Sequence, residues 1–221
     1  IGATRTYFDV ALAVKAGADV IVLDGMEGGT AASQEVFIEH VGIPILAAIP
    51  EAVRSLQELE MHREVQLIVS GGIRSGADVA KALALGADAV SIGVAAVVAL
   101  GDNSPAYESE YEAIGSSAGF YDDWHEGRDP VGISTQDPEL ARRFDPELGG
   151  RRLANYLRAM VLEAQTLARA CGKSHLHNLE PEDMVALTVE AAAMSKVPLA
   201  GTDWVPGREP RAYADQNPDG G

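Results

Sequence analysis

The segment VQLIVSGGIRSGADVAKALALGADAVSIG, residues 65–93, decides the fold class. It holds two short apolar runs, residues 65–69 and 87–92, on either side of a helical pattern over residues 76–85. A nearly continuous apolar run is typical of a strand buried on both faces of a parallel sheet. Strand, helix and strand in this order predict a right-handed βαβ unit.

The same alternation extends upstream and predicts an α/β protein built as part of a (β/α)₈ TIM barrel. Two helices end in similar steps before a strand, KAGADV at 15–20 and ALGADA at 84–89, and such repeats favour a barrel over a doubly wound sheet. A full barrel takes about 250 residues, so four strands within residues 1–101 predict its C-terminal half. Because the chain opens with Ile1 rather than Met, we expect a partial chain. The remaining predicted strands are 18–23 and 44–49, and the remaining predicted helices are 7–16, 34–40, 51–61 and 94–100.

The pattern changes after the predicted half-barrel. Residues 102–150 are expected to form an irregular acidic segment, since 102–147 hold twelve acidic side chains against three arginines. Residues 151–205 are expected to form C-terminal helices, at 151–170 and 181–194. The Pro- and Gly-rich residues 206–221 are predicted to be a disordered tail.

Charge and cysteine content exclude several classes of protein. The 221 residues carry 33 acidic and 17 basic side chains, a formal net charge of −16, which disfavours nucleic acid and acidic membranes as partners. No apolar run reaches the roughly 18 residues that a membrane span needs. The single cysteine, Cys171, excludes an internal disulfide framework and a cluster held by this chain's thiolates alone. We therefore expect a soluble, cytoplasmic protein.

A glycine pair at the end of a predicted strand is the strongest functional signal. Gly71 and Gly72 let the backbone approach a ligand closely, and the N–H groups that follow favour a phosphate. In barrels the common phosphate site follows the last two strands, which would also place Gly93 there. The alternative is a tight turn with Arg74 on the surface. The predicted phosphate-binding residues are Ser70, Gly71, Gly72, Ile73, Arg74 and Gly93.

A second glycine-rich loop, DGMEGGTA at 24–31, follows the strand predicted at 18–23. Gly28, Gly29 and Thr30 are predicted to border a flat ligand, at the face where barrel active sites lie. A flexible loop is the alternative. Glu27 is either an acid–base group or a solvated carboxylate.

Three motifs together resemble a known family. GGIRSGAD at 71–78 with GADAVSIG at 86–93 resembles the flavin-phosphate segment of FMN-dependent barrels such as hydroxy-acid oxidases. DGMEGGTAAS at 24–33 resembles the Gly-Gly-Thr loop in the FMN domain of glutamate synthases. DPVGISTQ at 129–136 is similar to the Cys-Pro-Val-Gly-Ile-Ala-Thr-Gln of the same enzymes. The resemblance covers roughly residues 5–205.

The resemblance implies an FMN-dependent oxidoreductase of glutamate synthase type. Such an enzyme reductively aminates a 2-oxo acid such as 2-oxoglutarate with ammonia or an amine, giving glutamate or an N-substituted glutamate. The predicted phosphate residues would then hold the FMN phosphate, and Gly28, Gly29 and Thr30 would border the flavin ring. The family's flavin-contacting Lys is expected just before Ile1, and no catalytic residue is assigned in this chain.

One departure from the family concerns its three-iron, four-sulfur cluster. Three cysteines spaced Cys-x5-Cys-x4-Cys hold that cluster, and here those positions are Ala118, Trp124 and Asp129. None supplies a thiolate, and His125 cannot hold a cluster alone, so no iron–sulfur cluster is expected in this chain. The pattern is similar to cluster-free relatives, including the flavin subunit of N-methylglutamate synthase, whose amidotransferase-like and scaffold-like parts are separate partner subunits.

Other interpretations remain open. A hydroxy-acid oxidase-like enzyme or a nucleotide-binding barrel would use the same phosphate loop, although the His-Arg pair of the oxidases is not found. A non-catalytic subunit that keeps the barrel as an assembly surface is a further possibility. Cys171, His175 and His177 resemble a metal cluster, but a loop after a helix is favoured and no metal is predicted.

Overall fold

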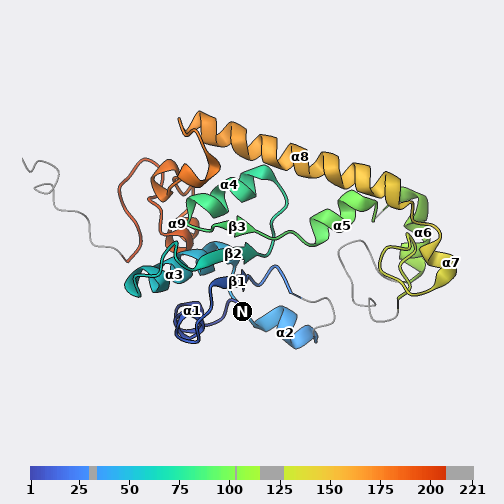
Figure 1. Ribbon diagram of the computed structural model, residues 1–221, viewed down its shortest axis with the longest axis horizontal. Helices are drawn as coiled ribbons and strands as arrows, with labels where there is room; N and C mark the ends of the chain where they lie inside the picture. Colours follow the sequence, from blue (N-terminus) through green and yellow to red (C-terminus); the bar gives the residue numbers. More distant parts are fainter. Residues whose placement is uncertain (30–33, 103, 115–126, 208–221) are drawn as a thin grey trace, which may run out of the picture.

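The computed structural model describes residues 1–29, 34–102, 104–114 and 127–207 as an α/β fold around a parallel sheet (Figure 1). The sheet has the order β1-β2-β3, and each strand is parallel to its neighbour. The βαβ unit predicted over residues 65–93 is therefore confirmed, although its second strand is shorter than expected. The strands are β1 (Val20–Asp24), β2 (Gln66–Ser70) and β3 (Ala89–Val90).

One face of the sheet forms the hydrophobic core. Leu23, Leu67 and Val69 are fully buried and pack with apolar side chains of the surrounding helices. The opposite face carries Val20 and Val22, which are 51% and 45% exposed. Within the described residues the sheet is open, so the structure shows part of a barrel at most. The first helices are α1 (Thr6–Lys15), α2 (Glu35–His40), α3 (Ile45–Glu58), α4 (Gly76–Ala84) and α5 (Val94–Leu100).

The first residues of the chain lie beside β1. Gly2 forms a parallel bridge with Asp24. The Asp24 N–H donates to the Ile1 carbonyl at 2.9 Å, and the Ala3 N–H donates to the Asp24 carbonyl at 2.8 Å. These bonds give β1 a parallel neighbour on the side away from β2.

The strand predicted at residues 44–49 is wrong, because these residues open helix α3. Their apolar run is compatible with either a short strand or a buried helix segment. Buried side chains at Ala48, Ala52 and Leu56 recur every four residues, which is the period of a helix face. Pro44 precedes the first turn, and the helix continues through Pro50.

The long C-terminal helix forms as predicted but begins earlier than residue 151. Helix α8 (Pro146–Ala170) starts after Asp145, whose side chain accepts hydrogen bonds from the Glu147 and Leu148 N–H groups. Pro146 occupies the first turn, where its missing N–H costs nothing. The helix packs along α4 and α5 and extends toward α6 and α7 (Figure 1).

The other segments combine short helical pieces. The single helix predicted at 181–194 is wrong, because residues 184–188 are not helical and Ala186 pairs with Leu199. Thr188 then caps a new helix by accepting from the Ala191 N–H. No helix in the described ranges is long and apolar enough to cross a membrane, and residues 208–221 of the predicted tail lie outside those ranges. The pieces are η1 (Pro105–Tyr107), α6 (Glu108–Ala113), α7 (Pro138–Ala141), η3 (Leu176–Asn178), η4 (Pro181–Asp183) and α9 (Val189–Ser195).

Candidate functional site

The two predicted glycine loops meet at the carboxyl ends of the strands. Gly25 follows β1 and Gly71 follows β2, and the Gly25 N–H donates to the Ser70 carbonyl at 2.9 Å. A Cβ on Gly71 would lie 3.2 Å from the Gly25 Cα, so the backbones are in direct contact. The β2–β3 register places Val69 beside Val90, and Gly72 and Gly93 each come three residues later, after the carboxyl ends of these neighbouring strands. Gly71, Gly72 and Gly93 therefore share one edge of the sheet.

The turn after β2 presents three backbone donors in succession. Gly71 and Gly72 have φ angles of +113° and +68°, which favour glycine. Within the described residues, the N–H groups of Gly71, Gly72 and Ile73 donate no hydrogen bond. The Ile73 side chain is only 7% exposed and packs into the core, which anchors the turn. Successive backbone N–H groups without an acceptor can bind an anion where they converge.

The N-terminus of α4, by contrast, is already occupied by carboxylates of the protein. The N–H groups of Arg74 and Ser75 both donate to Asp78 Oδ2 at 3.0 Å, and the Gly76 N–H donates to Glu163 Oε2 of α8 at 2.7 Å. Ser75 and Asp78 form a capping box. The helix terminus therefore offers none of these three donors to a ligand. The Arg74 side chain itself is exposed.

Glu27 has a structural contact that neither sequence interpretation anticipated. Its Oε2 accepts from the Ile45 N–H at 3.0 Å, at the first turn of α3, where Pro44 supplies no side-chain cap. Its aliphatic stem passes over the glycine pair, since a Cβ on Gly72 would lie 3.3 Å from the Glu27 Cβ. Glu27 thus caps α3 across the loop.

The second glycine loop folds over a buried carboxylate. The Gly28 N–H donates to the Gly25 carbonyl at 2.9 Å, and a Cβ on Gly28 would come within 2.1 Å of Asp24 Oδ1. At Gly29, no atom of the described residues lies within 4 Å of a Cβ placed there. Thr30, the third residue predicted here, lies outside the described residues.

Asp24 is a candidate that the sequence motifs did not single out. Its Oδ1 is buried and has no hydrogen-bond partner among the described residues, which is uncommon enough to call for an explanation. Asp24 shares a face of β1 with Val20 and Val22, and it pairs in register with Ser70. A polar residue at the C-terminal end of an inward strand face is a typical barrel site residue. The period of two along residues 20–24 is the signal that could have identified it.

Comparison with known proteins identifies the family. A family model described as a conserved region in glutamate synthase matches residues 1–105 and 120–174. The chain belongs to the glutamate synthase family. This confirms the resemblance inferred from the three motifs at the level of the family.

Two relatives show how much of a glutamate synthase the chain spans. It is 72% identical over 208 residues to a glutamate synthase large subunit-like protein of Rhizobium meliloti, covering 94% of this chain and 47% of the relative. It is 44% identical over 162 residues to an archaeal glutamate synthase [NADPH] of Methanocaldococcus jannaschii, covering 73% of this chain and 29% of the relative. The chain thus spans about half or less of these relatives' length.

Solved structures offer a more distant likeness. A flavocytochrome b2 variant with pyruvate bound is 18% identical, with a TM-score of 0.47 over 82% of this chain and 33% of the other. At this distance we draw nothing about function from it.

Helix α8 of this glutamate synthase family chain supports the turn after β2 from outside. The Tyr156 hydroxyl donates to the Arg74 carbonyl. Burial raises the pKa of Tyr156, and the charges of Asp78 and Glu163 add to that rise. The hydroxyl therefore stays protonated and remains a donor at neutral pH.

The histidines near the end of α8 make structural contacts. His177 Nε2 lies 2.8 Å from the Asp88 carbonyl, and His175 Nδ1 accepts from the His177 N–H at 3.2 Å. Cys171 is exposed. Among the described residues, no group of three or more His, Cys, Asp and Glu side chains is placed to hold a metal ion. The two histidines tie η3 to the residue that precedes β3.

Proposed function

We propose that this chain carries the FMN-phosphate site of a glutamate synthase-type oxidoreductase that reductively aminates a 2-oxo acid such as 2-oxoglutarate. The observation that carries the proposal is the run of free N–H groups at Gly71, Gly72 and Ile73, beside Gly93. The names of the relatives point to the same reaction class. When bound, FMN would supply the hydride transfer that the chain's own side chains cannot perform.

The residues at the strand ends fit a phosphate. The three N–H groups would each donate to a phosphate oxygen, and the exposed Arg74 guanidinium would balance its charge. This local compensation matters because the chain as a whole carries a net charge of −16. Gly93 leaves space on the neighbouring loop, with no atom within 4 Å of a Cβ placed there. Ser70 would lie at the edge of this site.

The second glycine loop would border the flavin ring, through Gly28, Gly29 and Thr30. Below it, Asp24 Oδ1 would accept a hydrogen bond from an N–H group of a bound molecule, since no protein donor reaches that oxygen in the described part of the chain. The exposed side chains of Val20 and Val22 would supply an apolar floor that excludes water from the reacting groups.

The proposed type of glutamate synthase and its amine substrate follow from the family resemblance and from the residues at the cluster-cysteine positions. We propose that the enzyme is a cluster-free relative in which the amine gives glutamate or an N-substituted glutamate, as in N-methylglutamate synthase. Amidotransferase-like and scaffold-like partner subunits would complete it. Steady-state assays of the intact protein with 2-oxoglutarate and either ammonium or methylamine would distinguish these substrates.

A pair of variants at one position tests the phosphate site. Gly72→Asp and Gly72→Asn share the same positive φ and nearly the same volume, so they differ in charge at the proposed anion site. We expect the intact wild-type protein to release FMN on denaturation. Either side chain crowds the close approach, so both variants should bind FMN less tightly than wild type, and the Asp variant at least tenfold more weakly than the Asn variant, since like charges repel.

Two results would contradict the proposal. Equal flavin occupancy in the Asp and Asn variants would place the phosphate elsewhere. Absence of flavin from the folded wild-type protein, purified with its partner subunits and supplied with FMN, would support a non-catalytic subunit.

A further inference from the structure

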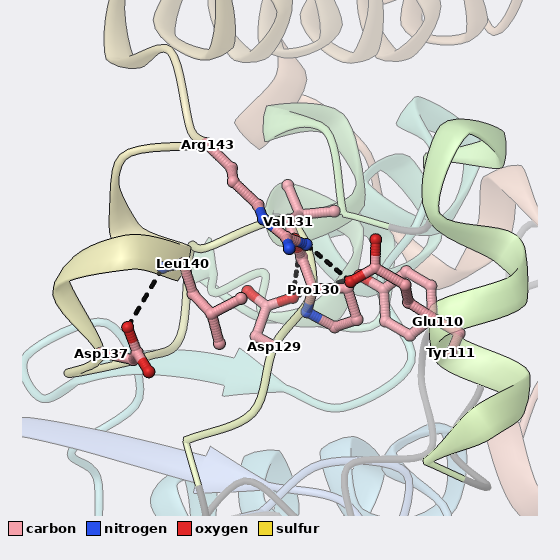
Figure 2. A network of polar contacts seen from close by, with 8 residues as sticks. All are labelled: Glu110, Tyr111, Asp129, Pro130, Val131, Asp137, Leu140 and Arg143. Atoms are coloured by element: carbon pink, nitrogen blue, oxygen red, sulfur yellow. Dashed lines mark hydrogen bonds and ion pairs between the residues drawn. The ribbon is translucent and has the colours of Figure 1, made fainter.

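Asp129 stands at the centre of a network of hydrogen bonds in the acidic segment (Figure 2). Its Oδ1 accepts from the Val131 N–H at 3.1 Å and lies 3.2 Å from the Tyr111 hydroxyl. Its Oδ2 accepts from the Ile133 N–H at 2.6 Å, the Ser134 N–H at 2.9 Å and the Ser134 hydroxyl at 3.4 Å. One carboxylate thus fixes three backbone N–H groups of the loop that follows it.

The same carboxylate connects the loop to helix α6. Tyr111 is only 8% exposed, and its hydroxyl donates to Asp102 Oδ1 at 2.6 Å. The Tyr111 oxygen therefore lies between Asp102, just after α5, and Asp129, at the start of the loop. This arrangement links α5, α6 and the loop 129–134 through side-chain oxygens.

Arg143, between α7 and α8, adds further contacts to this network. Arg143 Nη1 donates to Glu110 Oε2 at 2.7 Å and to the Pro130 carbonyl at 3.0 Å (Figure 2). The Glu110 carboxylate raises the pKa of Arg143, so this cation stays charged. A Cβ on Gly132 would lie 2.0 Å from the Leu140 carbonyl oxygen, which shows how closely the loop packs on α7.

The iron–sulfur cluster that the family implies does not fit these residues. Asp129 stands at the third cluster-ligand position of the resemblance, and both of its oxygens are already used by protein donors. Iron binding there would break a hydrogen bond to one backbone N–H group at Oδ1 or to two at Oδ2, and a carboxylate does not replace the thiolate that such clusters use. The other two positions, Ala118 and Trp124, and also His125, lie outside the described residues, and none of them carries a thiol.

We propose that the Asp129 carboxylate anchors the loop 129–134, beside Tyr111 of helix α6, by hydrogen bonds from the loop's own N–H groups, in place of a cysteine–iron bond. The physical basis is that hydrogen bonds to an ionised carboxylate are stronger than neutral ones. A charged acceptor with several backbone donors fixes a loop without a metal. The inference concerns the chain's own contacts and does not rest on the proposed function.

Two measurements on the intact protein test it. The first is iron and acid-labile sulfide content of wild type purified without oxygen. The second is amide hydrogen exchange over residues 129–134 in wild type, Asp129→Asn and the matched control Asp203→Asn, whose side chain is exposed and makes no hydrogen bond among the described residues. Tyr111→Phe provides a milder variant if Asp129→Asn fails to fold.

We expect no cluster iron or sulfide attributable to this chain. Asp129→Asn should speed exchange at Ile133 and Ser134 roughly ten- to a hundredfold, because an amide NH₂ replaces an acceptor oxygen. The Asp203 control should leave that exchange unchanged. Stoichiometric iron and sulfide that Asp129→Asn removes would overturn the proposal, as would unchanged exchange at 131–134 in Asp129→Asn or, if that variant does not fold, in Tyr111→Phe.

Discussion

Two loops of this molecule use backbone N–H groups in opposite ways. The turn at Gly71, Gly72 and Ile73 has three donors with no acceptor among the described residues. The loop at 129–134 has one acceptor, Asp129, that takes up its donors. A loop whose polar groups are satisfied internally has none to offer, whereas a turn with unused donors can bind water or a ligand.

Helix α8 connects the two regions. Near its start it follows the segment that contains Asp129, and further along it packs on α4 beside the glycine turn (Figure 1). Its Glu163 takes the Gly76 N–H, and its Tyr156 reaches the Arg74 carbonyl.

The largest effect is expected where α8 crosses α4. A Cβ on Gly76 would lie 2.2 Å from the Met160 carbonyl oxygen and 2.7 Å from the Ala164 backbone nitrogen, so the helices would have to separate. We predict that Gly76→Ala lowers the free energy of unfolding by about 3 kcal/mol, the upper end of overpacking costs. Denaturant unfolding measures this.

Gly150→Ala is the control for that change. Gly150 is also helical, but a Cβ there would meet no atom within 4 Å. Alanine should therefore stabilise the helix by about 0.5–1 kcal/mol. If Gly76→Ala behaved like Gly150→Ala, the close contact between α4 and α8 would be refuted.

A smaller effect is expected from the cap of α4. Asp78→Ala removes the acceptor of the Arg74 and Ser75 N–H groups and should cost about 1–2 kcal/mol of stability. Because those donors belong to the cap, the preference for FMN over riboflavin should stay within about threefold of wild type. Loss of that preference, measured by fluorescence titration, would mean that the cap residues take part in phosphate binding.

Compared with Asp78→Ala, Asp24→Asn should change the free energy of unfolding less and the affinity for the ligand more. In the part of the chain that the structure describes, the buried Oδ1 has no partner, so the loss of charge should alter the free energy of unfolding by less than about 1 kcal/mol. If a bound donor satisfies this oxygen, the affinity for FMN or the KM for substrate should worsen by roughly tenfold. A large loss of stability with unchanged binding would assign Asp24 to the fold instead.

The smallest effect concerns pH. Burial lowers the pKa of His62 below its ordinary value of 6.5, and the neighbouring Arg63 charge lowers it further. Because the unfolded chain then takes up the proton first, His62 contributes stability above that ordinary pKa and loses it as the pH falls.

His62→Gln should make the denaturation midpoint decline less between pH 7.5 and pH 5. This range spans the ordinary histidine pKa of about 6.5. The exposed His40, changed to Gln, is the control. An unchanged pH dependence in His62→Gln would exclude this contribution.

The sequence predicted the parts of the fold that depend on local pattern. The apolar runs before Ser70 and after Gly86 were sufficient to place two parallel strands and their crossover helix. The run at 44–49 misled, because a short apolar stretch fits a strand and a helix equally well. The buried residues Ala52 and Leu56, four positions apart, show that the helix continues beyond this run.

The candidate site was predictable only in part. The glycine pair could be recognised from its motif, but the saturation of the α4 N-terminus depends on Glu163, which lies 87 residues away in the chain from Gly76. Likewise, the sequence showed that Asp129 is not a cysteine. It could not show that this carboxylate holds the loop, because that requires the folded positions of Ile133 and Ser134.

The most direct measurement compares FMN with riboflavin, which lacks the phosphate, in binding to the intact protein after removal of its flavin. We predict that FMN binds at least a hundredfold more tightly, since two or more charge-assisted hydrogen bonds from Gly71, Gly72 and Ile73 each contribute roughly tenfold or more. Equal affinity for the two flavins would contradict the assignment of these free N–H groups to a phosphate.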